Sequence, residues 1–389
     1  MEKRIRKNVA MLVTPVENNV SLFAIARKDG GLLCEVSDKV FLISGCVPDT
    51  ISWPENCKVI DFKVKLHYVK QRSPFWFSLI VQIFKLVYIQ SCMAAEIVAR
   101  SKELDIVFCY LGYHFQIPII VSKLLGKKVI SGAWGVAEEA ETNYGKIIGR
   151  ILQFFLEFMY FFSDVIIIQS WRITEHKYLT KWKKKMRPGA QYFGEGEIYR
   201  PIVPFSKRSD TIGFVGRFTR RKGILELLEA IPLVLRKNNS IKFVLIGKGL
   251  FDQEIRQTIN DLDLAVNVDF VGQVRNEDLP NYYNQFKLLV IPSTSEGLPN
   301  VMLEAMSCHT PVLATPVGVI PDVISEGETG FLLANNSPEE IARRVIELFD
   351  HQDKLEQVTT KAQLVLHENY SYSAATLRYQ TLIDELSVG

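Results

Sequence analysis

The stretch from Pro292 to Leu333 constrains the fold of this chain most strongly. Its apolar and polar runs alternate at lengths that suit a parallel α/β sheet. We expect a strand over 288–291, a loop over 293–298, a helix over 300–308 with Pro299 suited to the first helical position, and a strand over 311–314. A strand, a polar loop and a helix N-terminus, in this order, form the place where α/β sheets bind anionic ligands.

Two glutamates, Glu296 and Glu304, stand in this stretch eight positions apart. A carboxylate repels phosphate, but it accepts hydrogen bonds from the hydroxyls of a ribose or a sugar. Gly297 lets the backbone come close to a ligand. The free N–H groups from Leu298 to Met302 could donate to phosphate or sugar oxygens, so the expected site also includes Leu298, Pro299, Asn300 and Val301. Taken alone, each glutamate is better explained as a solvated residue of a loop or helix.

A second cluster surrounds Gly216, between an expected strand over 211–216 and an expected helix over 222–237. Arg217 and Lys222 stand five positions apart around this turn. Arginine binds a diphosphate through its planar fork and lysine binds it as a point charge, so the two cations can converge on one ligand. The alternative is a solvated basic loop, which suits the neighbouring Arg220 and Arg221.

Two further loops follow expected strands at the same edge of this sheet. One contains Gly247, after the strand over 241–246, and the other contains Gln273 and Val274, after the strand over 269–272. We expect them beneath a nucleotide, with its base near Gln273 and Val274. A glycine after a strand is often only a turn, so these positions carry less weight than the charged ones.

The run Glu296-Gly297-Leu298-Pro299, followed by Glu304, resembles the signature of the retaining family-4 glycosyltransferases, also called glycosyl transferases group 1. The strings at 315–318 and 326–332 and the Gly-Arg and Lys-Gly pairs near 217 and 222 are similar too. The resemblance is dense over 212–333. It implies the GT-B architecture, an α/β fold of two Rossmann-like parallel-sheet domains that face each other across a cleft.

The resemblance also implies a function. A hexosyl group would pass from a nucleoside-diphosphate sugar to a hydroxyl of a lipid-linked or saccharide acceptor, with retention of anomeric configuration. Glu304 would bind the donor ribose and Glu296 the transferred sugar, while Arg217 and Lys222 would bind the diphosphate. Because two cations of the protein can stabilise the leaving group, we expect neither a metal nor a cofactor beside the donor.

The first half of the chain also alternates expected strands and helices, which predicts a second parallel sheet. We expect an acceptor-side domain over 1–198, a nucleotide-sugar-binding domain over 199–370, and a last helix over 371–389 that crosses back to the first domain. The resemblance is thin here. Asn18 and Asn19 stand where many members have a Gly-Gly loop, and Trp134 stands where many have a histidine. His114 is a candidate substitute, although a lone histidine is more often structural.

Charge is distributed unevenly between the halves. Residues 1–198 hold 27 Lys and Arg against 19 Asp and Glu, a net charge of +8, and the rest of the chain has a net charge of −5. Aromatic residues stand beside cations at Phe75-Trp76-Phe77 and at Trp182, which lies among Lys181, Lys183, Lys184, Lys185 and Arg187. This predicts a possible anionic membrane surface as a partner and no nucleic acid. Solvated cations and buried aromatics are the alternative.

The N-terminus has no apolar run long enough for a secretory signal, and the six cysteines are scattered. We therefore expect a cytoplasmic protein, which would be peripheral on the inner face of the membrane if it docks there. The apolar segments 75–89 and 151–171 are short or interrupted by charges, so neither is expected to span a bilayer.

Other classes of protein are less compatible with this sequence. It has neither the GxGxxG string of dinucleotide oxidoreductases nor the GxxxxGK[ST] string of P-loop NTPases. The alternative that stays open is a catalytically inactive scaffold of the same fold, or a protein that binds a nucleotide sugar without transferring it.

Overall fold

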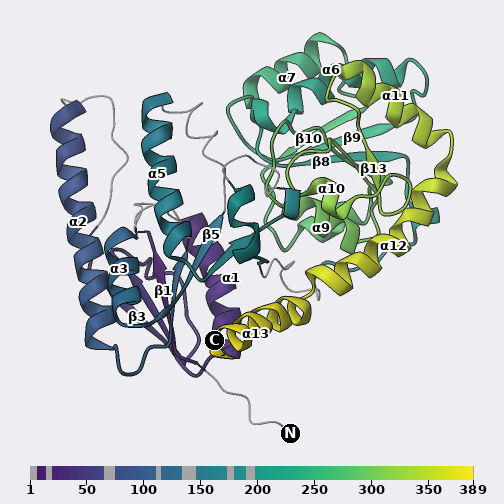
Figure 1. The fold of residues 1–389 in the computed structure, drawn as a ribbon. Coiled ribbons are helices and arrows are strands. Elements are labelled where there is room, and N and C mark those ends of the chain that lie inside the picture. Colours follow the sequence, from purple (N-terminus) through teal and green to yellow (C-terminus); the bar gives the residue numbers. More distant parts are fainter. Residues whose placement is uncertain are drawn as a thin grey trace, which may run out of the picture. The chain divides into compact units, whose positions relative to one another are not determined.

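The computed structural model describes residues 7–14, 20–64, 75–110, 115–133, 146–172, 179–189 and 198–388 (Figure 1). The chain forms two compact units. The N-terminal unit comprises residues 1–190 together with 375–389, and the C-terminal unit comprises residues 191–374. Each unit contains one parallel sheet with helices on both faces, which confirms the predicted fold class of two Rossmann-like units.

The N-terminal unit is built on seven parallel strands in the order β3-β2-β1-β4-β5-β6-β7. The strands are β1 Val9–Val13, β2 Val40–Ser44, β3 Cys57–Asp61, β4 Ile106–Tyr110, β5 Lys128–Ala133, β6 Val165–Ile168 and β7 Met186–Pro188. The helices are α1 Val20–Val36, α2 Phe75–Ala99, α3 Gln116–Leu124, α5 Lys146–Phe162, the 3-10 helix η2 Thr180–Lys185, and α13 Tyr372–Val388. The first six strands match the segments that the sequence predicts, 8–14, 40–44, 57–62, 105–110, 128–131 and 164–169, to within two residues at each end.

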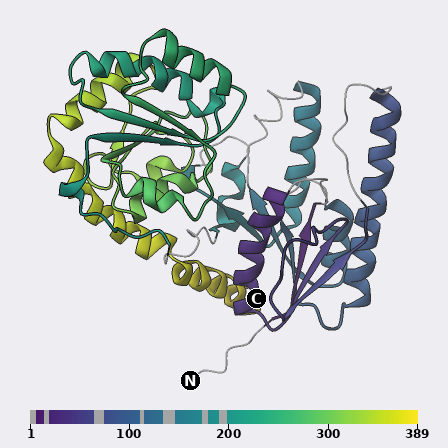
Figure 2. The same cartoon turned by 180° about the vertical axis from the view of Figure 1, so that it is seen from behind.

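Alternating side chains of this sheet separate its two faces. On one face, Leu12 and Val107 pack with Met93 of α2, Ile119 of α3 and Met159 of α5 in one buried cluster. On the other face, the Tyr110 hydroxyl donates to Asp29 of α1, and the Phe108 ring meets the Tyr379 ring of α13 edge to face. Figure 2, seen from behind, brings α1 in front of the strands. Helices α2, α3 and α5 therefore cover the face opposite to α1 and α13.

The C-terminal unit is built on six parallel strands in the order β10-β9-β8-β11-β12-β13. The strands are β8 Thr211–Val215, β9 Lys242–Ile246, β10 Val268–Gly272, β11 Leu288–Ile291, β12 Val312–Ala314 and β13 Phe331–Leu332. The helices are η3 Phe205–Lys207, η4 Arg220–Lys222, α6 Ile224–Leu235, α7 Asp252–Asp261, α8 Leu279–Tyr283, α9 Asn300–Ser307, α10 Ile320–Val323, α11 Pro338–Phe349 and α12 Gln352–Tyr370.

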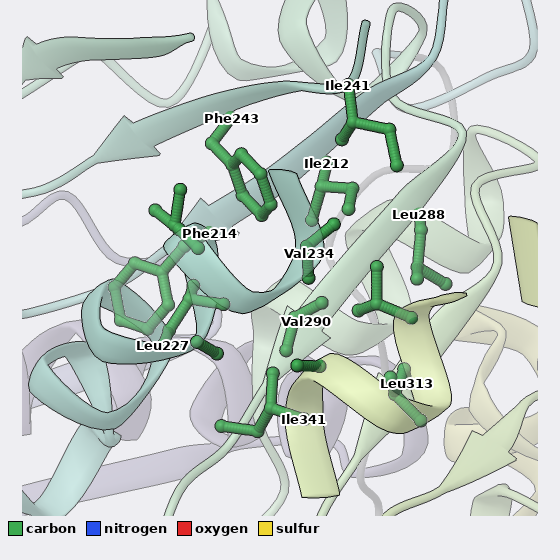
Figure 3. Close-up of a cluster of buried hydrophobic side chains, with 14 of the residues drawn as sticks. Ile212, Phe214, Leu227, Val234, Ile241, Phe243, Leu288, Val290, Leu313 and Ile341 are labelled. Carbon is green, nitrogen blue, oxygen red and sulfur yellow. The ribbon is translucent and has the colours of Figure 1, made fainter. Parts of the chain in front are cut away.

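The core of this unit lies on both faces of its sheet. Figure 3 shows one face, where Phe214 and Val290 of the strands meet Leu227 of α6 and Ile341 of α11. On the other face, Leu289 of β11 packs with residues of α8, α9, α10 and the end of α12. The strands are buried on both sides, which explains their nearly continuous apolar sequences.

The strand order places a topological switch in each sheet. In the C-terminal unit, the chain builds outward from β8 through β9 to β10, and it then returns to place β11 on the other side of β8. The helices that follow β8 and β11, α6 and α9, therefore pack on opposite faces of the sheet. Ligands of open α/β sheets bind at such switch points.

Three elements differ from the expectations. The short edge strands β7 and β13 were not predicted, because segments of three and two residues carry no periodicity of their own. Lys222 was expected to begin a helix, but it ends the 3-10 helix η4, and α6 begins at Ile224. Gly223 separates the two helices in a left-handed conformation with φ 68°.

Helix α2 matches the helical stretch expected over 75–100, which contains the apolar segment 75–89. Among the described residues, its part Val81–Ala99 is the one helix long and apolar enough to cross a membrane, judged by length and composition alone. The side chains of Ile89, Met93 and Ile97 are almost fully buried against the sheet. This half of α2 therefore serves as a core helix of the N-terminal unit.

Helix α13 packs on the N-terminal unit. Glu385 of α13 pairs with Arg187 beside β7, and Thr376 donates to Glu35 of α1 over 3.4 Å. The pairing with Glu385 raises the pKa of Arg187 and lowers that of Glu385. The last helix thus attaches to α1 and to the edge strand of the first sheet, although α12 before it belongs to the C-terminal unit.

Asp29 makes the stability of the N-terminal unit sensitive to pH. Burial raises its pKa from 3.8 to about 7, against the lowering effect of the Tyr110 hydroxyl. The folded state holds this proton more tightly than the unfolded chain, so the stabilisation is complete below pH 3.8 and is lost as the pH rises to about 7. Between pH 5 and 7 this loss amounts to about 2–3 kcal/mol.

We expect urea unfolding of the Asp29→Asn variant to lack this part of the pH dependence. The comparison needs unfolding curves of the wild type and the variant at pH 5, 6, 7 and 8. Equal slopes of unfolding free energy against pH in the two proteins would show that Asp29 does not titrate in this range.

Candidate functional site

The loops after β8 and β11 touch each other at the switch point of the C-terminal sheet. Gly223 has no room for a side chain, because a Cβ there would lie 2.0 Å from the carbonyl oxygen of Pro292. The Thr294 N–H donates to the carbonyl of Arg221 over 2.9 Å. A left-handed glycine and one backbone hydrogen bond thus hold the basic turn against the loop that carries Glu296.

Lys222 and Glu296 meet directly at this junction. The Lys222 Nζ lies 2.5 Å from Glu296 Oε1, and the Ser293 hydroxyl donates to the same oxygen over 2.6 Å. The two charged side chains are only 17% and 6% exposed. Sequence reasoning named both charged residues but missed their contact and missed Ser293, which lies in the same loop three positions before Glu296.

The backbone around Glu296 is fixed from a third loop. A Cβ on Gly318, whose φ is 59°, would lie 1.8 Å from the Glu296 carbonyl oxygen. The Val319 N–H donates to the Gly297 carbonyl over 3.2 Å, and the Thr315 hydroxyl donates to the Ser293 carbonyl. The loop from 315 to 319 after β12 therefore packs against the backbone of the Glu296 loop and fixes its position.

Glu304 lies inside α9 and is held by a buried tyrosine. The Tyr283 hydroxyl, on α8, donates to Glu304 Oε2 over 2.7 Å, and the Tyr199 ring lies 6.1 Å from the Tyr283 ring. Burial, followed by the charge of Glu304, raises the pKa of both tyrosines. Tyr283 is therefore a stable donor that orients one oxygen of Glu304. No motif in the sequence marked it, because it lies 21 positions before its partner.

The start of α9 differs from the expectation in two respects. Pro299 is not the first helical residue but the cap before it, with ψ 112°. The Met302 N–H is not free, because it donates to the Pro299 carbonyl over 3.0 Å. Leu298 and Val301 pack against the apolar core, while Asn300 is exposed. Donors for a ligand are therefore limited to the groups before Met302.

The loops after β8, β9 and β10 are joined through their glycines. The Gly216 N–H donates to the Ile246 carbonyl, and the Gly247 N–H donates to the Gly272 carbonyl, over 2.9 Å and 2.8 Å. A Cβ on Gly247 would lie 1.8 Å from the Gly216 carbonyl oxygen. Gly216 and Gly247 therefore lie together. Gln273 and Val274 follow the edge strand β10, where Gln273 is exposed and Val274 packs partly into the core.

Arg217 follows Gly216 directly and its side chain is exposed. Within the part of the chain that the structure describes, its guanidinium has no hydrogen-bond or ion-pair partner. It thus differs from Lys222, which Glu296 holds in place. The candidate residues of the N-terminal unit, namely Asn18, Asn19, His114 and Trp134, lie outside the described residues.

The segment around Trp182 has a role within the N-terminal unit. Lys185 Nζ donates to the carbonyls of Phe161 and Ser163, both over 2.7 Å, and so caps the C-terminal end of α5. The Trp182 ring packs edge to face on Tyr160 and Phe161, and Lys181 pairs with Glu157. Lys181, Trp182 and Lys185 are therefore engaged with α5, whereas Lys183 and Lys184 are exposed.

Metal ligands do not gather in the described ranges, where no group of three or more His, Cys, Asp or Glu side chains could hold an ion. The sequence contains one Asp-x-Asp string, Asp261-Leu262-Asp263. It lies at the C-terminal end of α7, which connects the parallel strands β9 and β10. That end of the helix lies at the amino edge of the sheet, opposite to Glu296, so the string is not part of the candidate site.

Residues 196–365 match the family model described as glycosyl transferases group 1. This part of the chain belongs to that family. The match covers the switch-point loops, α9 and the strands around them. The group 1 glycosyltransferase unit is therefore the C-terminal unit, and Lys222, Glu296 and Glu304 all lie inside it.

Similar proteins support the same assignment. The chain is 27% identical over 174 residues to an uncharacterized glycosyltransferase, MJ1178, of Methanocaldococcus jannaschii, covering 45% of this chain and 48% of that protein. It is 23% identical over 299 residues to N-acetyl-alpha-D-glucosaminyl L-malate synthase of Bacillus anthracis, covering 73% and 76%. The chain spans about half or less of the curated relatives matched first.

A solved structure extends the likeness to both units. The structure of Anabaena Alr3699/HepE in complex with UDP matches with a TM-score of 0.71 and 16% identity, over 98% of this chain and 100% of that one. At this identity the match establishes the fold, which is GT-B.

Proposed function

We propose that this protein is a retaining group 1 glycosyltransferase that moves a hexosyl group from a nucleoside-diphosphate sugar to an acceptor hydroxyl. One observation carries the proposal: the buried contact between Lys222 and Glu296 at the switch point of the C-terminal sheet. A cation for a leaving phosphate and a carboxylate for sugar hydroxyls are joined there, and Glu304 lies in the helix that follows.

Lys222 and Arg217 are the groups we assign to the donor diphosphate. Transfer leaves a nucleoside diphosphate, so negative charge develops on it as the glycosidic bond breaks. Fixed cations in a partly dry site stabilise this charge without costly reorganisation. Glu296, which also accepts from the Ser293 hydroxyl, holds the Lys222 ammonium in one position before the donor arrives, and the exposed Arg217 supplies a second cation from the same turn. The departing phosphate is then a suitable acceptor for the proton of the attacking hydroxyl.

Glu304 is the residue that we assign to the donor ribose. A carboxylate accepts hydrogen bonds from the two neighbouring hydroxyls of a ribose, and the Tyr283 hydroxyl fixes the orientation of the Glu304 carboxylate. Glu296 would accept from hydroxyls of the transferred sugar. Gln273 and Val274, at the carboxyl end of β10, are the groups assigned to the base.

Replacing Tyr283 by phenylalanine is expected to weaken UDP binding, although Tyr283 is not assigned to contact UDP itself. The variant removes the hydroxyl that holds Glu304 and should cost about 1 kcal/mol, or about fivefold in Kd. Calorimetry with UDP measures this effect, and Tyr282→Phe, the neighbour on the same helix, is the matched control. A lower melting temperature with unchanged UDP affinity would instead indicate a purely structural role for Tyr283.

Transfer is expected to proceed without a divalent metal. The cations of Arg217 and Lys222 supply the charge that a metal supplies in other enzymes of sugar transfer. Activity in EDTA should therefore equal activity in magnesium or manganese. Loss of transfer in EDTA, with recovery on adding either ion, would contradict this prediction and would require a metal at the diphosphate.

The acceptor is proposed as a hydroxyl of a saccharide or of a lipid-linked molecule, in a cytoplasmic setting. The Bacillus anthracis relative is named for a malate acceptor and a Staphylococcus aureus relative for poly(ribitol-phosphate). These two acceptors have no common chemical framework. The residues that select the acceptor of this chain are therefore expected in its N-terminal unit.

The deciding experiment is a binding screen followed by a transfer assay. The full chain is titrated with UDP, GDP and their common hexose conjugates, and donors that raise the melting temperature are then incubated with the enzyme. Release of nucleoside diphosphate supports the proposal. Tight donor binding with no hydrolysis or transfer would favour the sugar-binding scaffold, and no binding of any donor would refute both.

A further inference from the structure

The N-terminal unit exposes apolar side chains on two helices. On α2 they are Ile83, Phe84, Val87 and Tyr88, and on α5 they are Ile151 and Phe154; together we name them the apolar ridge. Phe84 is 72% exposed and Phe154 is 66% exposed. The four residues of α2 are spaced as one helical face. Both helices pack on α3, and a water-soluble surface rarely exposes so many large apolar side chains on such elements without a partner.

The ridge lies at one edge of the sheet. Helices that connect parallel strands run against them, so α2 and α5 begin at the carboxyl edge. Both views show the N-terminal halves of α2 and α5 extending past α3 and past the strands (Figures 1 and 2). Substrates of open α/β sheets bind at this same edge. The ridge is therefore next to the edge of the N-terminal unit where an acceptor would bind.

The charges beside the ridge on its own two helices are positive. The stretches 75–95 of α2 and 146–156 of α5 contain Lys85, Lys146 and Arg150 and no aspartate or glutamate, and Glu96 and Glu157 stand just beyond them. Lys65, Lys70 and Arg72 precede α2 in the sequence, while Glu138, Glu139 and Glu141 precede α5. The described surface of the ridge thus combines aromatic and aliphatic side chains with cations, which is the composition that binds anionic lipid interfaces.

We propose that the apolar ridge inserts into the interface of an anionic bilayer and brings the carboxyl edge of the N-terminal sheet to the membrane. The helix does not cross the bilayer, because Ile89, Met93 and Ile97 of α2 form part of the core and are at most 1% exposed. A second copy of the chain is a poorer occupant, since a symmetric contact would place Lys85 and Arg150 against the same cations. The membrane contact thus involves α2 and α5 rather than the Trp182 segment.

One consequence rests on the proposed function. If the protein transfers a sugar, its acceptor hydroxyl belongs to a molecule in or at the membrane, such as a lipid-linked saccharide. The attachment itself is independent of transfer, so it is tested without any donor or acceptor.

The test is flotation of the full chain with vesicles of phosphatidylcholine alone or with 30 mol % phosphatidylglycerol. We expect binding to the anionic vesicles, weaker binding at 0.5 M salt, and at least a tenfold loss for the Phe84→Glu/Phe154→Glu variant. Leu377→Glu is the matched control, because Leu377 is 65% exposed on α13, which covers the opposite face of the same sheet. It should bind like the wild type, and all variants should keep the melting temperature of the wild type.

Hydrogen exchange of the wild-type chain provides a second readout that needs no variant. Vesicles should slow exchange in peptides covering 81–89 and 150–156. Protection centred on 179–187 instead, equal binding by the double glutamate variant, or no binding to either vesicle would overturn the proposal. A dimer in solution that the double variant dissociates would also overturn it, and would assign the ridge to a second copy of the chain.

Discussion

Replacing Lys222 by alanine is expected to lower sugar transfer by about 10²- to 10³-fold, equivalent to about 3–4 kcal/mol of transition-state stabilisation. The variant removes the cation nearest to Glu296 and leaves that carboxylate, which is 6% exposed, without its ion-pair partner. Binding of the free nucleoside diphosphate should weaken by about 1.5–3 kcal/mol, the loss of one hydrogen bond to a charged group. Calorimetry and initial rates separate the two effects.

Two variants control this experiment. Arg220→Ala removes an exposed cation from the same 3-10 helix and should leave transfer within twofold of the wild type. Glu296→Gln removes the carboxylate but keeps its shape, so it should slow transfer while the free nucleoside diphosphate binds as tightly as before or more tightly. If Lys222→Ala retained normal affinity for the nucleoside diphosphate and normal transfer, the assignment of the diphosphate site to this turn would be wrong.

Replacing Arg208 by alanine is expected to destabilise the C-terminal unit by about 3–5 kcal/mol. This guanidinium is 5% exposed and has no carboxylate partner among its described hydrogen bonds. It donates instead to the Thr310 hydroxyl over 3.0 Å and to backbone carbonyls, those of Val203, Tyr283, Phe286, Cys308 and His309. Burial lowers its pKa to about 10, still high enough to keep the charge at neutral pH.

Four of the five carbonyls that Arg208 binds lie at or just after the ends of α8 and α9, the helices that carry Tyr283 and Glu304. Without the Arg208 guanidinium these carbonyls lose a donor in the core, which explains the large expected loss of stability. Calorimetric unfolding of the full chain would measure this loss. Lys207→Ala, at the exposed position just before it, is the control and should change stability by less than about 0.5 kcal/mol. A loss below about 1 kcal/mol for Arg208→Ala would mean that water replaces the guanidinium.

Local patterns predicted most of the fold and the charged residues of the site. Apolar runs of four to six residues separated by helical segments predicted eleven of the thirteen strands, because strands buried on both faces need such runs whatever surrounds them. Glu296 and Glu304 were found because both lie in one continuous stretch. Ser293 and Tyr283 were missed, because a serine in a loop and a tyrosine in a short helix have no pattern that distinguishes them from their neighbours.

The sequence by itself determined two parallel α/β units, the location of the basic turn, and the presence of two carboxylates after one strand. Tertiary structure alone decided that β8 and β11 are neighbours, which brings Lys222 to Glu296 across 74 positions of the chain. It also decided that Trp182 packs on α5 while Phe84 and Phe154 face outward. The physical reason is that periodicity records whether a residue is buried within its own element, whereas partners across the sheet depend on strand order, which no local pattern encodes.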